Sequence, residues 1–171
     1  MSFLRKYSLV ISQALLLVVA FMVVSAFQAR SLLATAGQAA PDLQAMDLQG
    51  EPFELADLDG RPVLVYFFAP WCPYCSASAD NIVRLRRWRS EEQLAIVAVA
   101  LDWTDEAEVL NYASRHELNV PVVLGNTGIA AAWNVYAFPT YYVLDSQHRV
   151  VSRDLGYSTQ LGLLWRSWLV E

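Results

Sequence analysis

The first pattern along the chain is a long uncharged stretch near its start. No charged residue lies between Lys6 and Arg30, and most side chains between them are apolar. Because roughly 20 apolar residues let a helix cross a bilayer, residues 7–27 are predicted to form one transmembrane signal anchor. Arg5 and Lys6 precede the apolar residues, so the positive-inside rule places residues 1–6 in the cytoplasm and exports the rest.

Two other interpretations of this stretch remain open. Ala34-Thr35-Ala36 before Gly37 has the small-x-small pattern of a signal-peptide cleavage site, although it lies well beyond the apolar run. A buried helix of a soluble protein is disfavoured, because the segment is apolar on all faces. Residues 28–40 are rich in Ala, Ser, Gln and Gly and are expected to be a tether with little to bury, which leaves residues 41–171 as the folded domain.

Apolar runs predict the strands of this domain. Residues 43–46 and 52–55 flank a Gly-containing turn and predict an N-terminal hairpin. Residues 63–68 and 94–101 are continuous apolar runs, which are typical of strands buried on both faces. Further short strands are expected over 120–123, 140–144 and 150–151, the last two as a hairpin.

Helical periodicity predicts the helices. They are expected after the 63–68 strand to about Arg89, over 104–116 with Thr104 as N-cap, over 127–133, and after a cap at Ser158 or Thr159. Five residues are assigned to the buried side of the last helix: Leu161, Leu164, Trp165, Trp168 and Leu169. Trp88 is assigned to the apolar stripe of the first helix, and Trp133, Trp165 and Trp168 are interpreted as core aromatics.

The order of these elements predicts an α/β fold. Strands alternate with helices, which favours a mixed central sheet with helices on both faces, an N-terminal β-hairpin and one preceding transmembrane helix. The net charge is −5, which argues against nucleic acid as the main partner. The charge is uneven: residues 1–41 carry a net +3 and residues 42–171 a net −8.

The main chemical signal is Cys72-Pro73-Tyr74-Cys75, directly after a predicted strand and at the start of a predicted helix. Unpaired N–H groups and the helix dipole at that position favour an anion, so Cys72 is the expected attacking thiolate. Cys75 lies one turn further and is expected to resolve the mixed disulfide. Pro73 removes an N–H that the first helical turn does not need and stiffens the ring.

Other uses of two cysteines fit less well. A zinc site needs two more ligands, and the two histidines, His116 and His148, lack a suitable spacing. A structural disulfide usually closes a longer loop. The sequence therefore favours redox chemistry, with no metal ion and no other cofactor expected.

The motif Trp71-Cys72-Pro73-Tyr74-Cys75, with Phe138-Pro139-Thr140 far downstream, resembles the thioredoxin superfamily. The opening from Ala40 to Val65 is similar to the TlpA/ResA branch of membrane-anchored thiol–disulfide oxidoreductases. The tail, Leu155–Leu169, is similar to the suppressor-of-copper-sensitivity protein D group.

This resemblance implies a role for each motif residue. Cys72 would be the nucleophile and Cys75 the resolving thiol. Pro139 would be a cis-proline facing them, and the Phe138 backbone would pair with an extended substrate segment. Trp71 would pack beside the active site, and Pro73 and Tyr74 would also support the active site.

Two positions depart from the family pattern. Tyr66 stands where thioredoxins often carry a buried acid, and Ser78 stands where ResA-like members often carry a glutamate. Because both acids are thought to move the proton of the buried thiol, the base for Cys75 is left unassigned. Asp80 and Asp102 are candidates by proximity in the pattern.

The resemblance implies a reductase of protein disulfides, located in the bacterial inner membrane with its catalytic domain in the periplasm. Since the periplasm is kept oxidising, a reductase there needs electrons from a membrane reductase partner. A disulfide oxidase or isomerase remains an alternative. So do a Cu(I)-binding module, because two thiolates suit a soft ion, and a redox-inert interaction domain.

Overall fold

The computed structural model describes residues 12–13, 15–17, 19–20, 32–35, 37–58 and 60–170. The chain divides into two compact units, Met1–Ser31 and Leu32–Glu171. The described residues of the first unit are helical, and the rest of the predicted anchor, 7–27, lies outside the described residues. In the described part of the chain, no helix has both the length and the apolar character needed to cross a membrane.

The second unit is built on a mixed seven-stranded sheet with the order β2-β1-β5-β4-β3-β6-β7. Only the β3–β4 and β4–β5 pairs are parallel among the described pairs. The strands are β1 (Gln44–Asp47), β2 (Pro52–Glu54), β3 (Val63–Phe68), β4 (Ala95–Ala100), β5 (Val122–Leu124), β6 (Thr140–Leu144) and β7 (Val150–Leu155). The predicted hairpins and the two fully buried central strands, β3 and β4, are confirmed.

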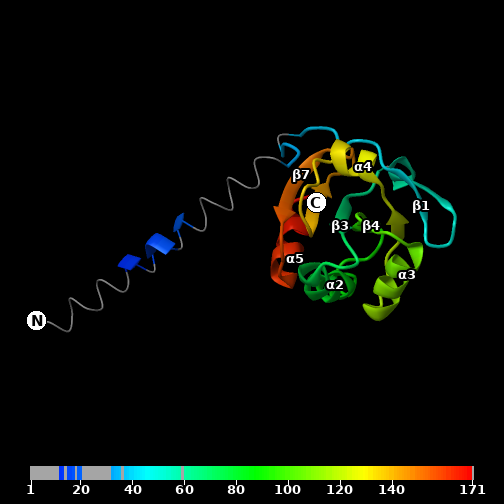
Figure 1. Ribbon diagram of the computed structural model, residues 1–171. Helices are drawn as coiled ribbons and strands as arrows, with labels where there is room; N and C mark the ends of the chain where they lie inside the picture. The colour runs from blue at the N-terminus through cyan, green and yellow to red at the C-terminus, as the bar shows by residue number, and fades with distance from the viewer. Residues whose placement is uncertain are drawn as a thin grey trace, which may run out of the picture. The chain divides into compact units, whose positions relative to one another are not determined.

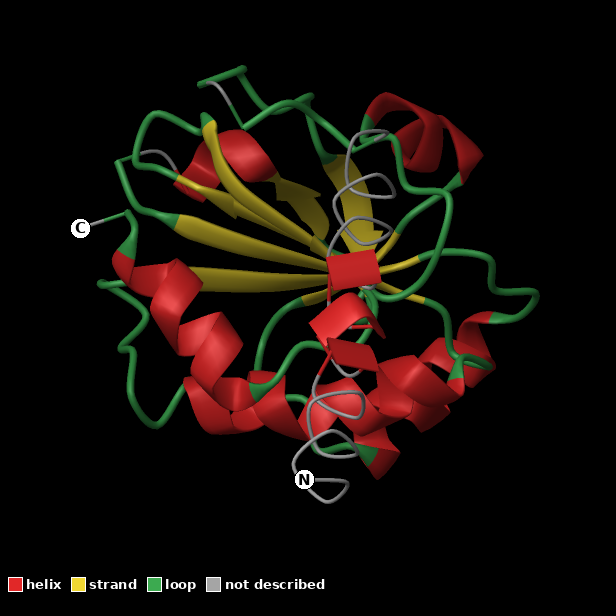
Figure 2. Ribbon diagram, turned by 90° about the vertical axis from the view of Figure 1, so that its left-hand side faces the viewer, coloured by secondary structure: helices red, strands yellow, loops and turns green. Residues whose placement is uncertain are grey.

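Helices cover both faces of the sheet (Figures 1 and 2). One face packs against α2 (Pro73–Leu85), α3 (Glu106–Arg115) and α5 (Gln160–Trp168). The other face packs against α4 (Thr127–Ala132) and the 3₁₀ helix η1 (Leu55–Leu58). The predicted α/β fold with a mixed, doubly covered sheet is therefore confirmed for this unit.

Two helix ends differ from the prediction. The α2 helix ends at Leu85 rather than near Arg89. Its C-cap is Arg86, whose backbone N–H donates to the Arg84 carbonyl oxygen. The α3 helix is capped by Asp105 rather than Thr104, because the Asp105 carboxylate accepts the N–H of Ala107.

The described residues between 32 and 40 pack onto the domain, although little burial was expected there. Leu32 and Leu33 are buried in the core of the α4 face. Arg153 on β7 donates to both of their carbonyl oxygens, at 2.9 Å from that of Leu32. Ala39 forms a bridge with Arg149.

The orientation of α5 is the main error of the sequence-based prediction. Leu163 and Ser167 face the core, whereas Trp165 and Trp168 are exposed to solvent. Trp88, beyond the end of α2, is exposed as well. Trp133 alone of the three predicted core tryptophans is buried.

Candidate active site

The strand β3 and the helix α2 position the cysteine pair just beyond the carboxyl end of β3, an interior strand of the sheet. Cys72 is the N-cap of α2, with extended backbone dihedrals, and its Sγ accepts the N–H of Cys75 at 3.3 Å. Pro73 occupies the first turn of the helix, where its missing N–H costs no hydrogen bond. A sulfur at this position receives the positive end of the helix dipole, which stabilises a thiolate.

Both cysteines are present as thiols, and both are buried. Cys75 is completely buried, and burial raises the pKa of its thiol far above the ordinary value. The Tyr66 hydroxyl beside Cys75 opposes this rise, because it can donate to the thiolate. The reduced site therefore holds Cys75 as a neutral thiol at physiological pH.

The segment that approaches Cys72 from the other side is Phe138-Pro139, directly before β6. The Phe138–Pro139 peptide bond is cis, as the motif predicted. The Cys72 thiol donates to the Phe138 carbonyl oxygen, with 3.8 Å between Sγ and O. The structure thus brings Cys72, Cys75 and Phe138-Pro139 together, although they are more than 60 residues apart in sequence.

Trp71 and Tyr74 form an exposed rim around the cysteines. The Trp71 indole N–H donates to the Asp102 carbonyl oxygen at 3.0 Å, and its ring meets Phe138 edge to face. A cleft of about 490 Å³ starts at Phe138 and lies between the ends of β4 and β5 and the start of α4. Its walls include Asp102, Trp103, Asn126, Tyr136 and Phe138.

Three tyrosines surround Cys75 on the inner side. The Tyr66 hydroxyl donates to the Cys75 carbonyl oxygen at 3.1 Å and lies 3.2 Å from the Tyr112 hydroxyl. Tyr141 stacks on Tyr66 with 5.2 Å between ring centroids. All three are fully buried, and burial raises the pKa of each phenol.

Tyr66 thus lies beside Cys75. In the sequence analysis this position was noted only because it lacks the buried acid of many thioredoxins. Asp80, one candidate base, instead pairs with Arg84 on the surface of α2. Asp102, the other, uses its backbone carbonyl to hold Trp71. Ser78 donates to the Tyr74 carbonyl oxygen within α2. A phenol next to the buried thiol can donate a hydrogen bond to it but carries no charge at neutral pH.

A family model described as Redoxin matches residues 35–161 of the chain, which span both cysteines and the cis-proline. The chain belongs to the Redoxin family. This Redoxin protein is similar to the thioredoxin-like protein YneN of Bacillus subtilis, with 32% identity over 126 residues, which cover 72% of this chain and 74% of YneN. It is also similar to the thiol-disulfide oxidoreductase ResA of Bacillus cereus, with 30% identity over 125 residues and 72% of each chain covered.

Solved structures agree with this assignment. A thioredoxin-family thiol:disulfide interchange protein of Chlorobium tepidum superposes with a TM-score of 0.70 at 23% identity, over 81% of this chain and 99% of that one, which shows the fold. A secreted Mycobacterium tuberculosis disulfide oxidoreductase, described as homologous to DsbE of E. coli, superposes with a TM-score of 0.65 at 25% identity, over 74% of this chain and 94% of that one. The family resemblance seen in the sequence is confirmed, and this Redoxin protein is a thiol–disulfide oxidoreductase. The copper-sensitivity subgroup stays a prediction.

Proposed function

We propose that this protein is a membrane-tethered reductase of protein disulfides, with Cys72 as nucleophile and Cys75 as resolving thiol. The observation that carries the proposal is the position of Cys72 at the N-cap of α2, where its Sγ accepts the Cys75 N–H. The attacking sulfur is held where an anion is stabilised, and the second thiol lies one helical turn behind it.

The reaction needs only these two thiols. Cys72 loses its proton, and the thiolate attacks one sulfur of a substrate disulfide, which breaks that S–S bond and releases one substrate thiolate. Cys75 then loses its proton and attacks Cys72 Sγ, which releases the second substrate thiolate. The substrate gains two electrons and two protons, and Cys72–Cys75 becomes a disulfide.

The environment of the reduced thiols supports the direction of electron flow. A thioredoxin-fold protein becomes a strong oxidant when its reduced form is unusually stabilised. Here Cys75 is a buried, neutral thiol with a raised pKa. Ionisation of Cys75 therefore adds no stability to the dithiol form, which favours a reducing potential.

The exposed rim supports a protein substrate rather than a small thiol. An extended segment next to the target cysteine would pair with the backbone at Phe138 and enter the cleft lined by Trp103 and Tyr136. Trp71 and Tyr74 offer apolar surface on either side of the cysteines.

The cellular setting forms the rest of the proposal. Residues 7–27 would anchor the chain in a bacterial inner membrane with the catalytic domain in the periplasm. The oxidised Cys72–Cys75 pair would then be reduced again by a membrane protein that carries electrons across the bilayer, because the periplasm is kept oxidising.

A trapping experiment tests the proposal. In Cys75→Ala, the mixed disulfide at Cys72 has no resolving thiol, so adducts with exported proteins should accumulate in the membrane fraction of an exporting bacterium. They should appear on non-reducing gels and disappear with added reductant. The double variant Cys72→Ala/Cys75→Ala is the matched control and should form none. Absence of adducts from Cys75→Ala, or equal adducts from both proteins, would refute the assigned roles.

A further inference from the structure

The outer face of α5 carries large apolar side chains that no described part of the domain covers. They lie at positions i, i+4, i+7 and i+8, which form one side of a helix. Their exposed fractions are 78% for Leu161, 65% for Trp165, 54% for Trp168 and 48% for Leu169. We call these four residues the α5 stripe.

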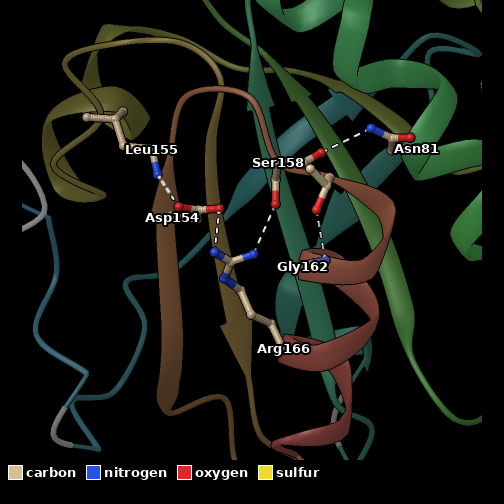
Figure 3. A network of polar contacts seen from close by, with 7 residues as sticks. Asn81, Asp154, Leu155, Ser158, Gly162 and Arg166 are labelled. Atoms are coloured by element: carbon tan, nitrogen blue, oxygen red, sulfur yellow. Dashed lines mark hydrogen bonds and ion pairs between the residues drawn. The ribbon is translucent and has the colours of Figure 1, made fainter. Parts of the chain in front are cut away.

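The rotation of α5 is fixed by contacts on its inner side. Arg166 forms an ion pair with Asp154 on β7 at 2.7 Å and donates to the Ser158 hydroxyl at 3.0 Å (Figure 3). Asn81 of α2 donates to the Ser158 carbonyl oxygen at 3.0 Å. With Leu163 also buried, α5 cannot turn its tryptophans inward without breaking this network.

The residue types of the stripe fit a membrane interface. Tryptophan is enriched where a bilayer meets water, because its ring is apolar and its N–H is polar. Residues 157–170 contain Arg166 and no acidic residue, whereas the whole region 42–171 has a net charge of −8. The stripe itself therefore carries no carboxylate that anionic lipid headgroups would repel, and the nearest acidic residues in sequence are Asp154, which pairs with Arg166, and Glu171.

The position of the stripe also fits a nearby membrane. On β7, a strand at the end of the sheet order, Arg153 holds the Leu32 and Leu33 carbonyls on the α4 face, and the next residue, Asp154, holds α5 on the opposite face. Figure 1 shows β7 and α5 along the same edge of the domain. Residues 28–31 separate Leu32 from the predicted anchor, and four extended residues span at most about 14 Å. With the proposed anchor at residues 7–27, so short a connection would hold this edge within reach of the bilayer.

We propose that the α5 stripe lies in the headgroup region of the membrane and holds the catalytic domain with its β7–α5 edge against the lipid. This inference rests on the membrane tether of the proposed function. A nine-residue helix is about 13 Å long, which is too short to supply the roughly 800 Å² that each partner of a stable dimer buries. Weak lipid affinity suffices, since the tether makes the contact intramolecular.

Tryptophan fluorescence of the full chain tests this arrangement. All six tryptophans lie between Trp71 and Trp168, so the emission reports on the domain and not on the predicted anchor. The full chain is reconstituted in vesicles of phosphatidylethanolamine and phosphatidylglycerol, with and without brominated acyl chains, which quench tryptophans in contact with lipid. Bromination should lower the emission by roughly a third, because two of the six tryptophans lie on the stripe.

Three variants complete the test. Trp165→Ser/Trp168→Ser should lose this quenching, and Leu161→Ser, which keeps every tryptophan, should weaken it. Leu110→Ser changes another leucine that is more than half exposed, on α3, and is the matched control that should leave quenching unchanged. Flotation with the vesicles and reduction of insulin disulfides are measured on each sample.

These readouts separate the inference from the function on which it rests. If the chain floats with the vesicles and reduces insulin but bromination changes nothing, the stripe proposal is overturned and the function stands. Emission that varies with protein-to-lipid ratio and not with bromination would assign the stripe to a second copy and overturn the lipid proposal as well. A chain that does not float overturns the tether, and the stripe proposal with it.

Discussion

Tyr66→Phe removes one buried hydroxyl from beside Cys75 and leaves the ring in place. The Tyr66 ring stacks on Phe68 and Tyr141, at centroid distances of 5.5 and 5.2 Å, and phenylalanine can keep both contacts. The hydroxyl bonds to the Cys75 carbonyl oxygen and to the Tyr112 hydroxyl would be lost. The substitution therefore isolates the hydrogen bonds from the packing.

Two effects follow from this loss. Tyr112 is left with a buried hydroxyl that lacks its partner, which costs about 1–3 kcal/mol in the free energy of unfolding. When the Cys75 thiolate forms, the Tyr66 hydroxyl can turn from the Cys75 carbonyl oxygen to the sulfur and lower the thiol pKa, so without this hydroxyl the thiolate becomes harder to form. Because a hydrogen bond to a charged group contributes about 1.5–3 kcal/mol, resolution of the mixed disulfide should slow by roughly 10- to 100-fold.

The assay separates the two chemical steps. Stopped-flow mixing of the reduced protein with a chromogenic disulfide reports the attack by Cys72 as a fast phase and resolution by Cys75 as a later one. The first rate should stay near that of the parent, and the second should fall. Urea unfolding of the reduced protein gives the stability difference.

Tyr141→Phe is the matched control. The Tyr141 hydroxyl is buried and makes no hydrogen bond to Cys75 or to Tyr112, so its removal should leave the stability and both rates near the parental values. If Tyr66→Phe resolves the mixed disulfide at the parental rate, the assignment of the Tyr66 hydroxyl to Cys75 is wrong.

Three further outcomes are expected. The pKa of the Cys75 thiol in the folded protein lies above the unfolded value of about 8.5, so its contribution to stability is complete below that pH and is lost as the pH rises, by up to about 1.4 kcal/mol per pH unit. Urea midpoints of the reduced protein should therefore fall between about pH 8.5 and 10. Cys75→Ala should show less of this loss. Brief iodoacetamide treatment should label Cys72 before Cys75, because Cys75 has no exposed surface; peptide mapping with Cys75 labelled first would reverse their roles. Gly125→Ala should lower stability by about 1–3 kcal/mol in thermal or urea unfolding, since the new Cβ would lie 2.7 Å from Leu101 Cδ2 and 2.9 Å from the Ala100 carbonyl oxygen; an unchanged midpoint would contradict the close packing.

The sequence predicted those elements whose pattern has a single physical solution. β3 and β4 are continuous apolar runs, and such runs are stable only in the centre of a covered sheet. The cysteine pair follows β3, and its spacing places both sulfurs in one helical turn. The position of Pro139 opposite Cys72 came from the family resemblance, because nothing local in the sequence links residues more than 60 apart.

The face of α5 could not be predicted in the same way, because the helix is apolar on both sides. Leu163 and Leu164 compete with Trp165 and Trp168 for the core, and the apolar pattern of the sequence does not decide between them. The choice is made by partners distant in sequence: Asp154 on β7 binds Arg166, and Asn81 on α2 binds the Ser158 carbonyl. The hydrogen bonds of Tyr66 could not be predicted for a related reason, since its hydroxyl is paired with Tyr112 of α3, which sequence spacing does not bring near.

The reduction potential of the Cys72–Cys75 pair tests the central claim most directly. The protein is equilibrated in glutathione and dithiothreitol buffers, quenched with acid, alkylated, and the dithiol fraction is measured by mass spectrometry. A buried Cys75 that stays a neutral thiol predicts a potential at or below about −200 mV, in the range of glutaredoxins and thioredoxins. A potential near −120 mV, typical of a dithiol form stabilised as a thiolate, would contradict the account and identify the protein as an oxidase.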